Sequence, residues 1–405
     1  MNEKTSNNRL IFHVDVNSAF LSWEAVERVK HGGEDLRTIP SCVGGSSRRS
    51  IVSAKSIPAK AYGIQTGESV FTAMRKCPDL VVVEPDFALY RRCSKAFKQI
   101  CREYAPVVQE FSIDECFLDF TGTSQIYPDP IALAYEIKDR IRDELGFTVN
   151  VGVANNKLCA KMASDFEKPD RVHTLFTEEV PKKMWHLPVG LLFLVGRSSA
   201  DKLKRNGILT IGDLASCDLD RVKRLLGEKF GIRAWEYAHG IDESPVDDRP
   251  RVRKSYSHDI TVEENIVTEE QAYAVLLSVV DTVARRMRRD GAKAGTISVA
   301  VRYLDFQTRS HQSRLERPVD TTREIFELSK KLLQELWQSK KPLRYLSVSL
   351  SDLDKGDGWE QLTLFEEEDA QRKKDEQMDR AVDALRTRFG EGIITRGTVM
   401  SLKKR

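Results

Sequence analysis

The segment IFHVDVNSAF at residues 11–20 decides the fold, together with FSIDECFLD at residues 111–119. Each segment places acidic residues, Asp15 in the first and Asp114 with Glu115 in the second, at the edge of an apolar run typical of a buried β-strand. A carboxylate is costly to desolvate unless a partner neutralises its charge. Because neither segment contains Lys or Arg, we expect that partner to be a divalent cation. Hard oxygen ligands favour Mg²⁺.

Three convergent carboxylates can hold two such ions about 4 Å apart, an arrangement used for in-line displacement at phosphorus. The two segments therefore predict a nucleotidyl-transfer site. Taken alone, Asp15 or Asp114 is equally compatible with a capping or turn carboxylate at the end of a strand.

Composition indicates a water-soluble globular protein of two to four domains. The chain has 405 residues, of which 40% are hydrophobic and 31% charged, and its formal net charge is +3. We expect no secretory signal and no membrane span, because the N-terminal residues lack an apolar stretch and no long apolar run follows. The seven Cys form no CxxC pair or metal-ligand spacing, which favours reduced thiols in a cytoplasmic protein.

Strand and helix patterns alternate in the first part of the chain. Residues 9–30 predict a strand that runs into a helix, and residues 80–175 predict further strands and helices of a layered α/β domain. Between them, residues 31–79 are rich in Gly and Ser and predict a small subdomain. From residue 176 the pattern is helical, and residues 194–214 resemble a helix-hairpin-helix, whose turn offers backbone N–H groups to phosphate. Leu194 stands where such a turn usually has Gly, and a plain two-helix packing unit remains the alternative.

Residues 241–253 carry two Pro and many charges and predict a linker. Residues 254–350 then predict a βαββαβ domain, with helices at 269–289 and 322–337. Basic residues gather at its start and at the end of its first helix, where they are suited to DNA phosphates: Lys254, Arg285, Arg286, Arg288 and Arg289. The alternative for residues 285–289 is a solvated helix end, because cations are favoured near a helix C-terminus.

Near the end of the chain, a Gln with three apolar residues lies between polar and acidic stretches. Such a segment is typical of peptide docking rather than of a core strand. Its docking residues are Gln361, Leu362, Leu364 and Phe365. The alternative is a local hydrophobic tuck against the preceding domain. Residues 379–389 predict a helix and residues 392–400 a strand.

Six motifs in order resemble the Y-family translesion DNA polymerases, in particular the DNA polymerase IV branch. They are HVDVNSAF, IPAKAYGI, SIDECFLD, NVGVANNKLCAKMASDFEKP, the helix-hairpin-helix segment and QLTLF. The resemblance implies a right-hand polymerase of α/β (α+β multidomain) class, with a ferredoxin-like palm, small fingers, a helical thumb and a βαββαβ little finger. The implied domains are a palm (1–30 and 80–175), fingers (31–79), a thumb (176–240), a linker (241–253), a little finger (254–350) and a C-terminal segment (351–405).

The resemblance also implies the reaction: a primer 3′-hydroxyl attacks the α-phosphorus of a deoxynucleoside triphosphate on primer-template DNA. The implied ligands of two Mg²⁺ are Asp15, Asp114, Glu115 and the carbonyl of Val16. Phe20 aligns with the steric gate that rejects ribonucleotides, and a plain core Phe is its alternative. Lys60 and Lys168 match triphosphate contacts. The family implies low fidelity, lesion bypass, no proofreading, a monomer, and a grip on the sliding clamp (β subunit) through QLTLF.

The sequence departs from its resemblance around the triphosphate. Ala54, Ile57 and Lys60 stand where Thr, Tyr and Arg are usual. Two hydroxyl groups are therefore absent, and the planar guanidinium of Arg is replaced by the compact ammonium group of Lys. We expect weaker nucleotide binding and a raised KM. Asn17 likewise stands where a carboxylate is common. Two other readings are a palm-type nucleotide cyclase, which needs no clamp peptide, and a catalytically weakened DNA- and clamp-binding accessory protein.

Overall fold

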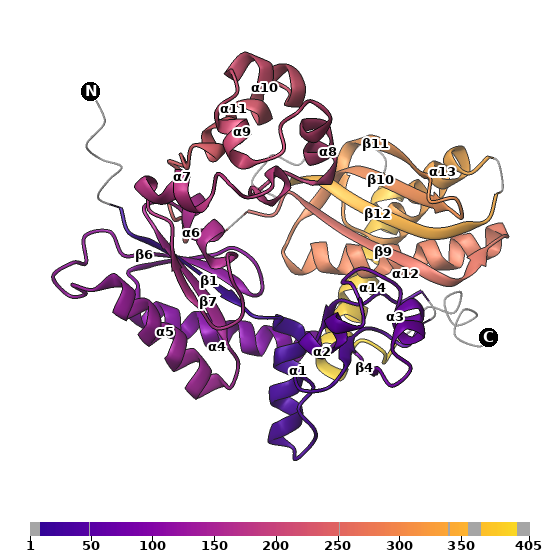
Figure 1. Ribbon diagram of the computed structural model, residues 1–405. Coiled ribbons are helices and arrows are strands. Elements are labelled where there is room, and N and C mark those ends of the chain that lie inside the picture. Colours follow the sequence, from indigo (N-terminus) through magenta and orange to yellow (C-terminus); the bar gives the residue numbers. More distant parts are fainter. Residues whose placement is uncertain (1–8, 48, 251, 339–340, 355–365, 395–405) are drawn as a thin grey trace. The chain divides into compact units, whose positions relative to one another are not determined.

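The computed structural model describes residues 9–47, 49–250, 252–338, 341–354 and 366–394 (Figure 1). The chain divides into two compact units, residues 1–250 and residues 251–405, and each is described by itself. None of the helices in the described ranges is long and apolar enough to cross a lipid bilayer.

A five-stranded sheet forms the centre of the first unit. Its strand order is β5 (Val107–Glu110), β6 (Glu115–Asp119), β1 (Ile11–Val16), β7 (Val149–Ala154) and β8 (Val172–Thr174). The central strand β1 is antiparallel to both β6 and β7, and all six of its residues are buried. The sequence prediction of a buried strand at the first acidic segment is therefore confirmed.

Helices cover both faces of this sheet. Phe12 and Val14 face a core shared with α4 (Phe87–Tyr104) and α5 (Pro130–Leu145), while Ile11 faces α6 (Lys157–Ser164) on the other side. The close approach of α6 depends on Gly152 of β7, because a Cβ at that position would lie 1.9 Å from the carbonyl oxygen of Ala160. This contact brings α6 against the face of the sheet that carries Asp15.

Residues between α1 (Ala19–Lys30) and α4 form a small three-stranded sheet with two short helices. The strand order is β3 (Ala54–Lys55), β2 (Ser41–Val43) and β4 (Val81–Val83), and the helices are α2 (Ile57–Ala61) and α3 (Val70–Lys76). Its main core is a single cluster of eight buried residues, most of them small. The structure thus has a subdomain of little bulk here. Its predicted end at residue 79 is wrong, because Val81–Val83 pair with β2 of this sheet and not with the five-stranded sheet.

Short helices make up the rest of the first unit. They are η2 (Thr177–Glu179), α7 (Val180–Lys183), η3 (Val189–Leu191), α8 (Arg197–Arg205), α9 (Ile211–Ala215), α10 (Leu219–Leu226) and α11 (Glu228–Ala238). In the turn before α8, Leu194 adopts a φ of 70°, in the left-handed region that favours Gly. A side chain there costs roughly 1–2 kcal/mol. The turn therefore keeps the backbone conformation of a glycine although the residue is Leu.

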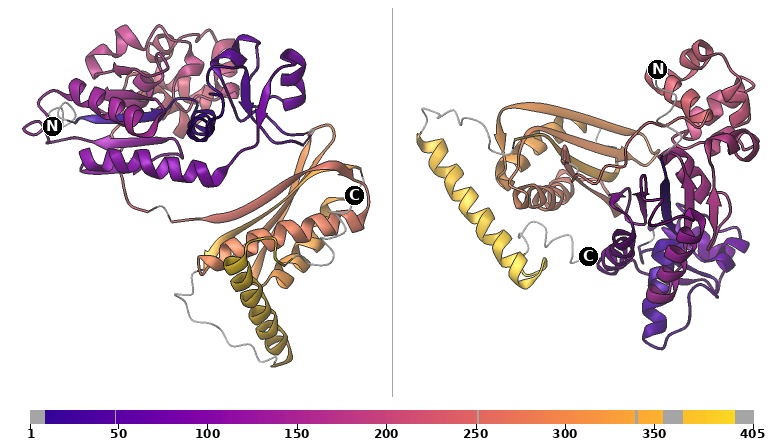
Figure 2. Two further views of the ribbon diagram at one scale, coloured as in Figure 1. Left: turned by 90° about the horizontal axis from the view of Figure 1, so that it is seen from below. Right: turned by 90° about the vertical axis from the view of Figure 1, so that its left-hand side faces the viewer.

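The second unit has the predicted βαββαβ order (Figure 2). Its antiparallel sheet has the strand order β11 (Thr308–Val319), β10 (Lys293–Tyr303), β12 (Leu343–Asp354) and β9 (Ser255–Ile266). The helices α12 (Glu269–Arg289) and α13 (Thr322–Leu336) pack on one face of the sheet around a shared apolar core. Among the described residues of this unit, no helix covers the other face.

The helix α14 (Glu366–Phe389) begins well before the predicted residue 379 and packs beside α13. Polar contacts hold it: Asp379, only 3% exposed, accepts a hydrogen bond of 2.7 Å from the backbone N–H of Thr322. The docking segment at 361–365 and most of the predicted strand at 392–400 lie outside the described residues.

Candidate active site

Asp15 and Glu115 lie directly opposite each other on β1 and β6, so both side chains project from the same face of the sheet. They face an open cavity of about 570 Å³. Residues from four separate parts of the sequence line it, among them Phe20, Lys60, Asp114 and Lys168. The strand pairing therefore brings the two acidic segments together, as the sequence indicates.

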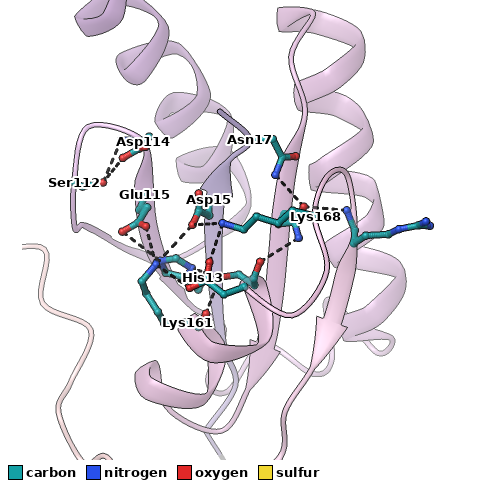
Figure 3. Close-up of polar contacts among 12 residues, drawn as sticks. His13, Asp15, Asn17, Ser112, Asp114, Glu115, Lys161 and Lys168 are labelled. Carbon is teal, nitrogen blue, oxygen red and sulfur yellow. Dashed lines mark hydrogen bonds and ion pairs between the residues drawn. The ribbon is translucent and has the colours of Figure 1, made fainter. Parts of the chain in front are cut away.

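Two ammonium groups lie among these carboxylates (Figure 3). Lys161 Nζ is 2.7 Å from Glu115 Oε1 and 3.6 Å from Asp15 Oδ2, and Lys168 Nζ is 3.0 Å from Asp15 Oδ2. The expectation that no Lys or Arg side chain neutralises these carboxylates is therefore wrong. Both lysines are distant from the carboxylates in sequence but close to them in the folded chain. Sequence reasoning missed Lys161; the available signal was its place on the same helical face as Asp165, with which it forms an i,i+4 ion pair.

Asp114 is held apart from the other two carboxylates. Its Oδ1 accepts a hydrogen bond of 2.5 Å from Ser112 Oγ, and Figure 3 shows it turned toward that residue. Lys98, which is buried, donates a hydrogen bond of 2.6 Å to the carbonyl of Ser112 and so braces this turn. Among the described residues no group of three acidic, His or Cys side chains is close enough to hold a metal ion.

The chemistry of the donors nevertheless fits Mg²⁺. The cavity is lined by the carboxylate residues Asp15, Asp114 and Glu115 together with Val16, the supply of hard oxygen ligands that this ion prefers. Two of these carboxylates already share a cation, the Lys161 ammonium. Burial raises the pKa of the Glu115 carboxyl to about 7, although the hydrogen bond from Lys161 acts in the opposite direction. A buried carboxylate of this kind gains from a bound divalent ion.

A neutral histidine lies next to Glu115. His13 is fully buried, and its Nδ1 lies 2.8 Å from Ser164 Oγ. Burial and the nearby cations of Lys161 and Lys168 hold the pKa of His13 well below its usual value. Its Nε2 lies 3.9 Å from Glu115 Oε2 and has no hydrogen-bond partner. His13 thus adds no positive charge to the site.

Phe20 lies at the wall of the same cavity. Its ring stacks on Tyr90 with 4.4 Å between centroids and 9° between planes, and Phe87 contacts it edge-on at 6.0 Å. Phe20 is therefore not a plain core residue. One side of its ring packs on Tyr90, and the residue still borders the cavity. Such packing holds a bulky ring in one orientation.

The predicted triphosphate residues both line the cavity. Lys60 belongs to α2, and Lys168 to the loop that follows α6. The departures noted in the sequence, Ala54 and Ile57, also line the cavity, and the Ile57 side chain is exposed. The missing hydroxyl groups therefore concern the cavity itself and not a distant surface.

The basic residues predicted in the second unit have separate environments. Arg288 is 10% exposed and lies 3.3 Å from Asp379 and 2.8 Å from Asp383, while Arg285 is ion-paired with Glu391. Lys254, Arg286 and Arg289 are exposed. Two of the four arginines at the end of α12 therefore hold the C-terminal region of the same unit.

The helix-free face of the second sheet has a character that the sequence analysis did not note. The strand registers place small hydroxyl residues and two arginines on this face: Ser257, Ser298, Ser310, Ser347, Ser349, Arg302 and Arg314. Arg302 stacks over the ring of Tyr345 at 4.6 Å. The signal was present as period-two alternation of Ser with Val and Leu in β12.

Comparisons with known proteins agree with this geometry. Models described as the impB/mucB/samB family and its C-terminal domain match residues 14–165 and 253–364, and one described as the thumb domain of DNA polymerase-iota matches residues 194–242. DNA polymerase IV of Clostridium acetobutylicum is 40% identical over 98% of this chain and 100% of its own length.

DNA polymerase IV of Acetivibrio thermocellus is 36% identical over 97% of this chain and 98% of its own length. DNA polymerase IV 1 of Bacillus subtilis is also 36% identical, over 97% of this chain and 93% of its own length. A solved Y-family DNA polymerase chimera shares the fold, with a TM-score of 0.75 and 22% identity over 85% of this chain and 99% of that chain. The chain therefore belongs to the DNA polymerase IV family of Y-family DNA polymerases, a family of DNA-directed DNA polymerases.

Proposed function

We propose that this protein extends a DNA primer on a template by adding deoxynucleotides, and that it does so across damaged positions. The observation that carries the proposal is the pairing of Asp15 with Glu115 across β1 and β6, at a cavity that also presents Phe20, Lys60 and Lys168. Carboxylates, cations and an aromatic wall together match the phosphates and the sugar of a nucleotide. This proposal also accounts for the full-length similarity to DNA polymerase IV proteins.

Asp15, Asp114, Glu115 and the Val16 carbonyl would hold two Mg²⁺ ions. When bound, the ions activate the primer hydroxyl and neutralise charge on the triphosphate. Ser112 and Lys98 would hold the turn that carries Asp114, and so keep this ligand near the metal site. Lys161 keeps Glu115 and Asp15 compensated in the metal-free protein.

Lys168 and Lys60 would bind the triphosphate from opposite sides. Lys168 is 36% exposed and already shares Asp15 with Lys161, so its ammonium can turn to a phosphate oxygen without leaving a carboxylate unpaired. Phe20, held by its stack on Tyr90, would lie against the sugar and exclude a 2′-hydroxyl. The absent hydroxyl groups at Ala54 and Ile57 predict a high KM for the nucleotide.

The helix-free face of the second sheet would bind the DNA backbone. Its serines are short, so a phosphate backbone can approach the sheet closely, and its arginines supply positive charge. The exposed Lys254, Arg286 and Arg289 would add to this binding, whereas Arg288 would serve mainly to hold α14. DNA affinity should therefore fall steeply with salt.

The remaining features belong to the same proposal. A small β2–β4 subdomain acting as fingers would leave the nascent base pair open, which favours lesion bypass and low fidelity without proofreading. Residues 1–30 and 84–175 would be the palm, because β4 at residues 81–83 belongs to the small sheet. Residues 176–240 would be the thumb and 254–350 the little finger. The segment with Gln361, Leu362, Leu364 and Phe365 would bind the sliding clamp, and the protein would act as a cytoplasmic monomer.

Primer extension by the protein alone tests the proposal. With Mg²⁺ and deoxynucleoside triphosphates, we expect short distributive extension on an undamaged template and insertion opposite an abasic site. The primer should not shorten when nucleotides are withheld. Salt-sensitive DNA binding without any extension would instead favour a catalytically weakened accessory protein.

A further inference from the structure

Two buried amides lie beneath the loop that carries Lys168. Asn17 follows β1 and Asn150 belongs to β7, and these side chains are 7% and 0% exposed. Asn17 Nδ2 donates a hydrogen bond of 3.0 Å to Asn150 Oδ1. The loop above them, residues 165–171, connects α6 to β8.

The pair uses its remaining polar atoms to hold the backbone of this loop. Asn150 Nδ2 donates to the carbonyls of Ser164, at 3.1 Å, and Glu167, at 2.6 Å. The N–H of Asp170 donates to Asn17 Oδ1 at 3.0 Å, and the N–H of Arg171 donates to Asn150 Oδ1 at 3.2 Å. Four backbone groups on both sides of Lys168 are thus satisfied by two side chains. Asn17 Oδ1 also accepts a hydrogen bond of 2.9 Å from Thr148 Oγ1.

These contacts determine which way each amide points. Asn150 faces two carbonyls with one end, so that end must be its NH₂ group, and its oxygen must face Asn17. Asn17 therefore has to present a donor. A carboxylate at position 17 would place one of its oxygens at hydrogen-bond distance from Asn150 Oδ1, and both atoms are acceptors. A flip of the Asn150 amide would instead turn its oxygen toward the carbonyls of Ser164 and Glu167. An unmade hydrogen bond of this kind is expensive in a buried site.

We propose that the Asn17–Asn150 pair positions Lys168 for the triphosphate. Because Asn150 Oδ1 needs a hydrogen-bond donor, the side chain at position 17 has to be an amide and not a carboxylate. Asn17 is a positioning residue: it lines the cavity but acts on the nucleotide through the loop. The part that concerns the nucleotide rests on the proposed polymerase function. The part that concerns the loop does not.

A double-mutant cycle tests the proposal, with Asn17→Asp, Asn150→Ser and the double variant. In the otherwise unchanged chain, Asn17→Asp should raise the nucleotide KM about five- to tenfold and change kcat less. In the Asn150→Ser chain the same change should raise KM less than about twofold, because a hydroxyl can donate to the introduced carboxylate. The introduced charge is the same in both chains, so its repulsion of the triphosphate cancels in the comparison.

Hydrogen exchange of residues 165–171 gives a readout that needs no polymerase activity. Asn17→Asp should speed exchange of the Asp170 and Arg171 amides about tenfold or more. The double variant should restore most of the protection of the Asp170 amide, whose acceptor is the side chain at position 17, but not that of Arg171, whose acceptor belongs to Asn150. Thermal unfolding of each variant separates this local change from global loss of structure. If Asn17→Asp proves unfolded, Asn17→Ser, which loses the donor geometry without adding charge, is used for both readouts.

Equal KM increases in the two backgrounds would overturn the proposal, since charge alone would then explain them. Unchanged exchange in Asn17→Asp would overturn it as well. If the wild-type protein shows no extension at all, the polymerase proposal fails, while the exchange result still decides whether the amide pair holds the loop.

Discussion

Lys161 donates a hydrogen bond of 2.7 Å to Glu115, although the two residues lie 46 positions apart in the chain. The same ammonium lies 3.6 Å from Asp15 Oδ2. Because a buried carboxylate without a partner is costly, Lys161 takes the compensating role in the protein without metal. The site is therefore kept intact, with its acidic residues in place, before a divalent ion arrives.

Lys161→Met should destabilise the metal-free protein. Glu115 would then lose the ammonium that donates to it, while Asp15 would keep its ion pair with Lys168. The melting temperature should fall by roughly 3–8 °C. Calorimetry without divalent ions measures this shift, and added Mg²⁺ should reverse much of it. Lys168→Met, at a more exposed side chain, is the matched control and should have a smaller effect. An unchanged melting temperature for Lys161→Met would contradict the compensating role.

Metal affinity should rise with pH. The pKa of Glu115 is about 7 in the folded protein, above its unfolded value near 4.5, so a proton occupies this ligand below pH 7. A divalent ion must displace that proton, and Mn²⁺ should bind about ten times more weakly at pH 6 than at pH 8. Titration of Mn²⁺ by electron paramagnetic resonance measures this ratio.

The raised pKa of Glu115 also makes the stability of the fold depend on pH. Because the folded pKa is raised, the proton stabilises the metal-free fold, and this contribution is lost as pH rises through 7.

Glu115→Gln should bind Mn²⁺ weakly and with little dependence on pH in this range. A pH dependence equal to that of the wild type would assign the titration to another group.

Phe20→Val should relax discrimination between the two sugars. The smaller side chain leaves room for a 2′-hydroxyl, so the efficiency of ribonucleotide incorporation relative to deoxyribonucleotide should rise about tenfold or more. Single-nucleotide incorporation with each sugar measures the ratio. Phe87→Val is the control, since Phe87 touches the Phe20 ring edge-on and is itself exposed. Equal effects of the two substitutions would mean that general packing, not the ring of Phe20, sets the choice of sugar.

Arg288→Met should affect stability more than DNA binding. It would remove the ion pairs of Arg288 with Asp379, which is 3% exposed, and with Asp383, at a cost of about 3–5 kcal/mol to the second unit. Calorimetry of the full chain should show one transition move down, with the salt dependence of DNA affinity nearly unchanged. Arg286→Met, at an exposed neighbour, should show the reverse. A weaker salt dependence with unchanged stability for Arg288→Met would indicate a phosphate contact.

Much of the fold was predictable from local patterns. The strand at residues 11–16 follows from its apolar run, and α12 agrees with its predicted bounds because apolar residues recur at helical spacing between Thr268 and the closing arginines. The βαββαβ order of the second unit follows in the same way. The sequence predicted that the carboxylates of the two acidic segments converge, but not that the two strands are neighbours.

Contacts between distant side chains were not predictable. Lys161 reaches Glu115 only because Gly152 lets α6 pack closely on β7. Arg288 belongs to a basic run in the sequence, yet its partners lie on α14, about ninety residues later. The first turns of α14 are almost entirely charged, and such a segment shows little amphipathic pattern before its tertiary contacts are known.

We infer that Asp15, Asp114 and Glu115 form one catalytic centre, although Asp114 is turned toward Ser112 in the structure. Single-turnover incorporation of one deoxynucleotide with Mg²⁺, comparing the wild type with Asp114→Ala, tests it most directly. We predict that the variant binds primer-template DNA normally and loses activity by about a thousandfold or more. Activity within about tenfold of the wild type, with DNA binding intact, would contradict the account.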